Sequence, residues 1–227
     1  MSILTPVEPA PSLTEQAVAT LRREILTTRL LPGETLSEAS AAQLLGLGKA
    51  PVRAALARLA EEGLVQAVPR RGWIVSLVTI RDIHEVFDLR LMLEPEAARR
   101  AAGRVDTAEL RRLDAVCACG YRPEDEESTH AFLDANKAFH VAVAELSGNG
   151  RLARQVDRLL DESTRMLALG LRRRDRTGEM AHEHHALIEA LALGRAEEAA
   201  SIMRQQVGAS RSMVLAALTT PESAMVL

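Results

Sequence analysis

Residues 31–75 have the sequence LPGETLSEASAAQLLGLGKAPVRAALARLAEEGLVQAVPRRGWIV, and this stretch decides the fold. Ser37 is a favourable N-cap for a short helix that Gly46 ends. A further helix begins at about Lys49, carries apolar residues at helical spacing and ends at Gly63. Two helices joined by a short glycine-bearing turn are typical of a helix-turn-helix, whose second helix lies in the major groove of DNA.

A β-hairpin is expected directly after this pair of helices. The segments LVQAV and WIVSLV are apolar and β-branched, and the turn between them runs from Pro69 to Gly72. Upstream, Ser12 and Glu15 form a capping box for a helix that ends near Thr28. These elements predict a winged helix-turn-helix that binds double-stranded DNA, with a small β-hairpin as its wing.

The predicted DNA contacts lie early in the recognition helix, off its apolar stripe, and at the tip of the wing. Lysine and arginine can bind phosphates or guanine edges, and the wing can reach a neighbouring minor groove. The predicted contacts are Lys49, Ala50 and Arg53 in the helix, and Arg70, Arg71 and Gly72 at the wing.

Composition limits where and how nucleic acid can bind. Residues 1–76 carry eight Lys or Arg against seven Glu, so the DNA-binding face must be a local patch. Aromatic residues are scarce, which disfavours stacking on single strands. The sequence has no apolar run of transmembrane length and no signal peptide, and its two cysteines, spaced C-x-C, are expected to be reduced thiols. We therefore expect a cytoplasmic protein without membrane association.

The remainder of the chain has helical periodicity throughout, broken at glycines. We expect helices at 79–103, 106–118, 127–147, 149–171, 179–193 and 195–217. The fold class is therefore mainly α, with a winged helix-turn-helix followed by an all-α bundle. The predicted division is a flexible tail at 1–11, a DNA-binding domain at 12–78, an all-α effector-binding and dimerisation domain at 79–218, and a C-terminal tail at 219–227.

Arg90 lies inside FDLRLMLEP, an almost wholly apolar run, where a charge is costly to bury unless it is paired. One interpretation is a structural ion pair with Asp88 or with Glu94, one turn further on. The other is that Arg90 faces a cavity and binds the carboxylate of a ligand through its guanidinium fork. The sequence leaves both open.

Histidines supply a second candidate site. HEHHA at 182–186 is not a zinc-protease motif, because H-E-x-x-H requires histidine where Ala186 stands. Asn136 and His140 are four residues apart and project from one face of a helix, and His184 lies on the next helix but one. Each histidine alone is more often structural than a ligand, so a site here depends on several helices converging.

Two parts of the sequence resemble known protein families. PGETLSE, AAQLLGLGKAPVRAALARLAEEGLV and RRG resemble the N-terminal domain of GntR-family bacterial regulators, over about residues 13–76. DLRLMLEPEAARRAA, NKAFHVAVAELSGN and EHHALIEALALGRAEEAASIMRQQV resemble the FCD effector domain of the FadR-type branch, over about 80–217. The first resemblance implies that Lys49 and Arg53 contact DNA and that Arg71 and Gly72 lie at the wing. The chain departs from it at Ala39, often arginine, and at Gly48, usually serine or threonine.

The FCD resemblance also implies a metal site and a ligand. Many members hold a divalent metal, such as Zn or Ni, in the bundle and bind a small organic acid there; others bind no metal. Mapped onto this chain, the metal ligands are Asn136, His140, His184 and Gln206. Gln206 replaces the family's histidine, and neutral amides are weaker ligands for such metals. The predicted effector-binding residues are Arg90, Asn136, His140 and His184.

Three functions remain to be weighed. The leading one is a homodimeric transcription regulator, a repressor and not an enzyme, whose bundle binds a small carboxylate metabolite and shifts operator affinity. The second is a metal-dependent enzyme that uses His140 and His184, with an accessory DNA-binding domain; no catalytic residue is evident for it. In the third, the bundle only dimerises and senses nothing.

Overall fold

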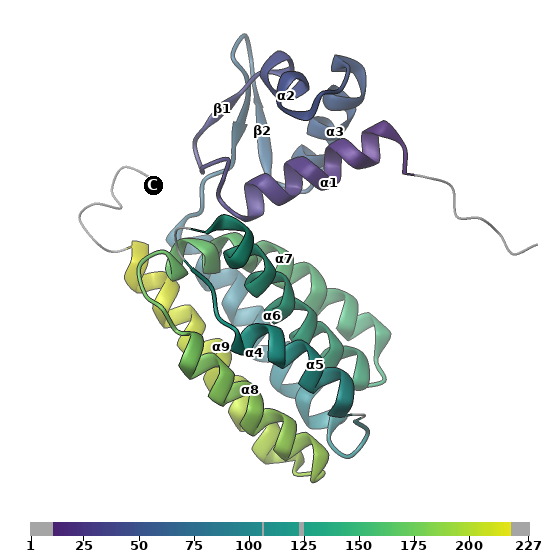
Figure 1. Cartoon of the computed structure of the whole chain (residues 1–227), viewed down its shortest axis with the longest axis vertical. Coiled ribbons are helices and arrows are strands. Elements are labelled where there is room, and N and C mark those ends of the chain that lie inside the picture. Colours follow the sequence, from purple (N-terminus) through teal and green to yellow (C-terminus); the bar gives the residue numbers. More distant parts are fainter. Residues whose placement is uncertain (1–10, 106, 123–124, 219–227) are drawn as a thin grey trace, which may run out of the picture. The chain divides into compact units, whose positions relative to one another are not determined.

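The structure is a computed structural model that describes residues 11–105, 107–122 and 125–218 (Figure 1). The described chain divides into two compact units. The first ends at residue 77; the second begins at residue 78 and also includes residues 26–28. The predicted tails at 1–11 and 219–227 fall, except for residue 11, outside the described residues.

The N-terminal unit is a winged helix-turn-helix, as predicted. Its helices are α1 (Leu13–Leu26), α2 (Glu38–Leu45) and α3 (Lys49–Glu61), and its strands are β1 (Thr35–Leu36), β2 (Val65–Val68) and β3 (Gly72–Val75). The strands form an antiparallel sheet in the order β1-β3-β2, with Leu36 opposite Trp73 and Ala67 opposite Trp73 on the other side. The two-residue strand β1 was not predicted, because so short a segment shows no alternation.

Local capping explains where the first helices begin and end. Ser12 and Glu15 form the expected capping box before α1. Ser37 caps α2 through a reciprocal box with Ser40, and Gly46 ends α2 in the left-handed conformation, at φ 64°. Gly48 is the N-cap of α3 and provides no side-chain hydrogen bond. The helix-turn-helix is therefore set by local sequence.

The second unit is helical throughout its described residues, which confirms the predicted bundle. Its helices are α4 (Ile80–Ala101), α5 (Thr107–Ala118), α6 (Glu126–Leu146), α7 (Gly150–Leu171), α8 (Thr177–Ala192) and α9 (Ala196–Leu218). Phe87, Phe132 and Phe139 are fully buried among aliphatic side chains in its core. Within the described ranges, no helix is long and apolar enough to cross a membrane.

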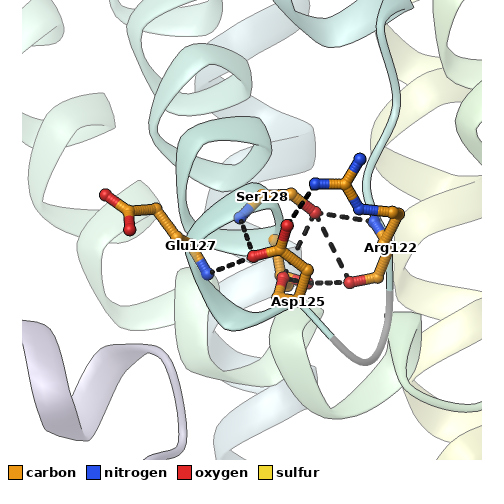
Figure 2. Close-up of polar contacts among 5 residues, drawn as sticks. Arg122, Asp125, Glu127 and Ser128 are labelled. Carbon is orange, nitrogen blue, oxygen red and sulfur yellow. Dashed lines mark hydrogen bonds and ion pairs between the residues drawn. The ribbon is translucent and has the colours of Figure 1, made fainter.

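Two helix starts matter for the site. At α6, the carboxylate of Asp125 accepts hydrogen bonds from the backbone N–H groups of Glu127 and Ser128, and also contacts Arg122 (Figure 2). This cap fixes the N-terminus of α6. The helix α8 begins at Thr177, two residues earlier than expected, because Gly178 lies inside its first turn and does not break it.

Candidate DNA-binding surface and buried polar site

The recognition helix presents its predicted contacts to solvent. Lys49, Ala50 and Arg53 are all exposed on the first turns of α3, while the apolar stripe of the helix is buried. Arg53 donates from Nε and Nη2 to the two carboxylate oxygens of Glu38 on α2, at 2.8 and 2.7 Å. These hydrogen bonds lower the pKa of Glu38 and fix the orientation of the Arg53 guanidinium.

The wing requires glycine at its tip. Arg70 and Arg71 are exposed in the turn between β2 and β3, and Arg70 has a left-handed backbone at φ 65°. Gly72 follows at φ 92°, and a Cβ atom there would lie 2.9 Å from the carbonyl oxygen of Leu36. Only glycine allows β1 to approach so closely, so Gly72 supports the shape of the wing.

A buried chain of polar side chains crosses the bundle. Arg90 on α4 is 1% exposed, and its Nη1 donates to the hydroxyl of Ser163 on α7 at 3.1 Å. Arg90 Nε donates to Glu94 Oε1 at 2.6 Å, and Glu94 Oε2 lies 2.6 Å from His140 Nδ1 on α6. Of the two interpretations for Arg90, the ion pair with Glu94 is present, whereas Asp88 pairs with Arg211.

The charge state of Glu94 sets the tautomer of His140. Burial alone would raise the pKa of Glu94, but Arg90 and His140 outweigh it and lower that pKa to about 2. An ionised carboxylate can only accept hydrogen bonds, so His140 Nδ1 carries a proton. The lone pair of neutral His140 is therefore on Nε2.

His184 on α8 is arranged in the same way. Its Nδ1 lies 3.2 Å from Asp114 Oδ1 on α5, and its ring stacks on Phe139 with centroids 3.9 Å apart. Burial lowers the pKa of His184, which favours the neutral imidazole. The two imidazole centroids of His140 and His184 are 5.7 Å apart, so the structure brings these two predicted residues together.

The two predicted amides are buried beside these helices. Asn136 lies one turn before His140 on the same face of α6, and Gln206 lies on α9, which packs against α8 and α4. Within the described chain, Asn136 Oδ1 and both Gln206 side-chain heteroatoms, Oε1 and Nε2, are buried without a hydrogen-bond partner. Such groups are costly to leave unsatisfied, so a water molecule, an ion or a ligand is expected to bind them.

The donor set fits a divalent metal. Metal-binding imidazoles usually donate their second N–H to a carboxylate, as His140 does to Glu94 and His184 to Asp114. Asn136 Oδ1 and Gln206 Oε1 would complete two nitrogen and two oxygen donors. In the described residues, no group of three or more His, Cys, Asp or Glu is placed to hold a metal, so a metal here depends on these amides.

Arg176, the N-cap residue of α8, was missed at the sequence level. It is 3% exposed; its Nε donates to Glu179 at 2.6 Å and its Nη2 to Glu183 at 2.8 Å. Its Nη1 is buried without a hydrogen-bond partner in the described chain. The segment LRRRDR looks like a solvated charge run, and the helix was expected to begin at residue 179. Glu94 was expected only as a possible partner of Arg90, and its contact with His140 was not predicted. Asp114, the partner of His184, was not identified from the sequence.

Comparison with known proteins covers both units. The family model for the FCD domain matches residues 85–209, and the model described as bacterial regulatory proteins, gntR family, matches residues 13–75. An HTH-type transcriptional regulator in an unstable DNA locus of Streptomyces ambofaciens is 30% identical over 83% of this chain and 79% of its own.

Two further proteins are similar over half or most of the chain. The HTH-type transcriptional repressor RspR of Escherichia coli K12 is 31% identical, and the match spans about half of each chain. The solved structure of E. coli McbR/YncC superposes with a TM-score of 0.73 at 24% identity, covering 89% of this chain and 99% of the other. At that identity the likeness shows the shared fold.

Proposed function

Because the chain belongs to the GntR family of bacterial regulatory proteins and carries an FCD domain, we propose that this transcriptional regulator is a repressor controlled by a small organic acid. The observation that carries the proposal is the buried polar site in the bundle. A bundle that only held two subunits together would not need buried polar atoms without partners. The repressor role takes support from RspR, a relative named as a repressor.

Operator binding is assigned to α3 and the wing. Lys49 and Arg53 are exposed cations at the start of the helix that enters the major groove in winged helix-turn-helix proteins. Ala50 lies between them, where a small side chain permits close approach to the groove. Arg70, Arg71 and Gly72 at the wing would then lie against the flanking phosphates or minor groove.

Two copies of the chain would bind one operator. An operator with two-fold symmetry has half-sites about one helical turn apart, and one recognition helix fills one half-site. We assign dimerisation to the helical domain. Binding of the acid in each bundle would favour one arrangement of the paired DNA-binding domains over another, and operator affinity would follow the population of each arrangement.

The bundle site would hold the acid together with a divalent metal. His140, His184, Asn136 and Gln206 would be the metal ligands, and the metal would attract the carboxylate of the acid as a positive charge. Glu94 and Asp114 keep both imidazoles in the tautomer that has Nε2 available. Because two of the four donors are neutral amides, we expect weaker binding than in a three-histidine site.

The test is elemental analysis of the purified full chain without a His-tag, combined with a thermal-shift screen of small organic acids. We expect Zn or Ni at one per chain and a rise in Tm with at least one acid. The variant His140→Ala with His184→Ala should lose the metal and the response. His185→Ala with His182→Ala is the matched control, since both these side chains are exposed on α8. An acid response that survives loss of both buried histidines would contradict the assignment.

A further inference from the structure

Arg176, the N-cap residue of α8, is buried at the start of that helix. Met180, His184 and Leu187 are buried at helical spacing, so they share the side of α8 that faces the bundle core. His184 comes eight positions after Arg176, which is about 12 Å along a helix axis. Arg176 Nη2 donates to the carboxylate of Glu183, the neighbour of His184 in sequence, so the two side chains together span part of this distance.

Helix packing places Arg176 and the histidines in the same bundle. The helix α8, which carries His184 and begins directly after Arg176, packs against α5 and α9, and the ring of His184 lies beside that of His140 on α6. The buried guanidinium and the buried imidazoles therefore lie in the interior of one helical domain.

Two hydrogen-bond donors remain in this interior after the acceptors have been assigned. If Asn136 Oδ1 and Gln206 Oε1 bind a metal, then Arg176 Nη1 and Gln206 Nε2 are two buried donors that still lack a partner in the described chain, as does the ring nitrogen His130 Nε2 on α6. Donors of this kind match the oxygens of an anionic ligand, and arginine is the side chain best suited to carboxylates.

Arg90, the arginine predicted from the sequence, is already engaged. Its Nε is bound to Glu94 and its Nη1 to Ser163, and its guanidinium lies over the Phe87 ring, 4.9 Å from the centroid. These contacts fix the Arg90 guanidinium beside Glu94, where it balances the negative charge of that carboxylate. Arg176 differs in having a buried guanidinium nitrogen that no described residue satisfies.

We propose that Arg176 binds a carboxylate group of the effector through Nη1, and that Arg90 instead positions Glu94 and, through it, His140. This inference rests on the proposed control of the bundle by a small organic acid. It deepens that proposal by naming the residue that recognises the acid's negative charge.

The experiment is isothermal titration calorimetry on the full-length protein. The probe is whichever of acetate, lactate, malonate, succinate and citrate raises the Tm of the wild type most, together with the matching primary amide. The variants are Arg176→Gln, Arg176→Lys and, as matched control, Arg174→Gln. Arg174 belongs to the same segment and donates to the same Glu179, but its side chain is 62% exposed.

We expect Arg176→Gln to weaken binding of the acid roughly ten- to hundredfold, the range for a hydrogen bond to a charged group. Arg176→Lys should fall between this variant and the wild type, and Arg174→Gln should match the wild type. The amide should bind the wild type more weakly than the acid, and Arg176→Gln should reduce that preference, because the variant lacks the Arg176 contact while the metal still attracts the carboxylate. Metal content should not change in Arg176→Gln.

Each contrary result has a distinct meaning. Wild-type affinity for the acid in Arg176→Gln overturns this inference and leaves the acid-controlled regulator intact. If both Arg176 variants fail to fold, equal binding of acid and amide to the wild type overturns it instead. If no acid on the panel binds the wild type, both this inference and the proposed effector class are wrong.

Discussion

Arg53 combines an exposed position on the recognition helix with a fixed orientation, since Glu38 accepts two hydrogen bonds from it. A guanidinium held in this way can meet a base edge or a phosphate without losing much side-chain entropy on binding. Glu38 also places a negative charge close to the DNA-binding face. Because this charge repels phosphates, Glu38 should weaken DNA binding in which Arg53 makes no specific contact.

Replacing Arg53 by alanine should abolish the operator shift. One well-placed arginine contributes about 1–3 kcal/mol to recognition, and a dimer loses two. Electrophoretic mobility shift at fixed salt measures the effect, with light scattering to check that the dimer persists. Arg58→Ala, at the far end of α3, is the control and should bind within a few-fold of wild type. Retained binding by Arg53→Ala would mean that the recognition surface lies elsewhere.

Glu94 connects Arg90 to His140 in the buried site, so its removal should destabilise the fold. Glu94→Gln leaves Arg90 buried without a counter-charge, and losing one partner of a buried ion pair costs about 3–5 kcal/mol. Urea unfolding of the wild type and variant at pH 7 measures this difference. A difference below about 1 kcal/mol would show that water or a bound anion already compensates Arg90.

The difference in unfolding free energy between the wild type and Glu94→Gln should also depend on pH. The folded-state pKa of Glu94 is about 2, below its ordinary value of 4.5. Its stabilisation is therefore complete above about pH 4.5 and declines as pH falls from 4.5 towards 2. The gap in unfolding free energy between wild type and Glu94→Gln should be smaller at pH 3 than at pH 6. A constant gap over that interval would contradict the lowered pKa.

At the scale of elements, local signals determined most of what could be predicted. Ser37, Gly46 and the capping box at Ser12 and Glu15 act within a few residues, so helix ends in the N-terminal unit were visible in the sequence. The strand β1 was not visible, because its two residues are held by pairing with β3, which is distant in sequence. The start of α8 was misplaced because Gly178 is tolerated in a first helical turn.

The wing offers a test of one such long-range contact. Gly72→Ala forces a Cβ atom against the carbonyl oxygen of Leu36 as well as straining the backbone, whereas Gly63→Ala has the strain alone. Backbone strain costs about 1–2 kcal/mol. We expect Gly72→Ala to lower the free energy of unfolding by at least about 1 kcal/mol more than Gly63→Ala does, and to weaken operator binding. Thermal unfolding measures the difference in stability, and a mobility shift measures operator binding. Equal effects of the two substitutions would show that β1 adjusts freely.

The candidate site was predictable only in part, for a related reason. The spacing of Asn136 and His140 gives one helical face, and the burial of His140, His184, Asn136 and Gln206 agrees with a shared interior. Their assignment as metal ligands remains a prediction. Arg176 and Asp114 could not be found, because nothing local separates a buried charge from a solvated one. Only the packing of several helices decides which charges face inward.

At the scale of the whole molecule, the two units have different proposed tasks. We propose that exposed cations on α3 and the wing bind DNA, and that buried polar groups among α4, α6, α8 and α9 bind the effector. The effector can change operator affinity only by as much as it favours one arrangement of the dimer over another. Coupling of about 1–3 kcal/mol is usual and corresponds to a five- to 150-fold change in affinity.

Fluorescence anisotropy of operator DNA tests this coupling most directly. The DNA comes from the region upstream of the protein's own gene, and the untagged full chain is titrated at one salt concentration, with and without the acid that raises its Tm most. We expect tight binding without the acid and a Kd for the operator that is at least fivefold higher with it. An acid that binds the bundle and leaves the operator Kd unchanged would contradict it.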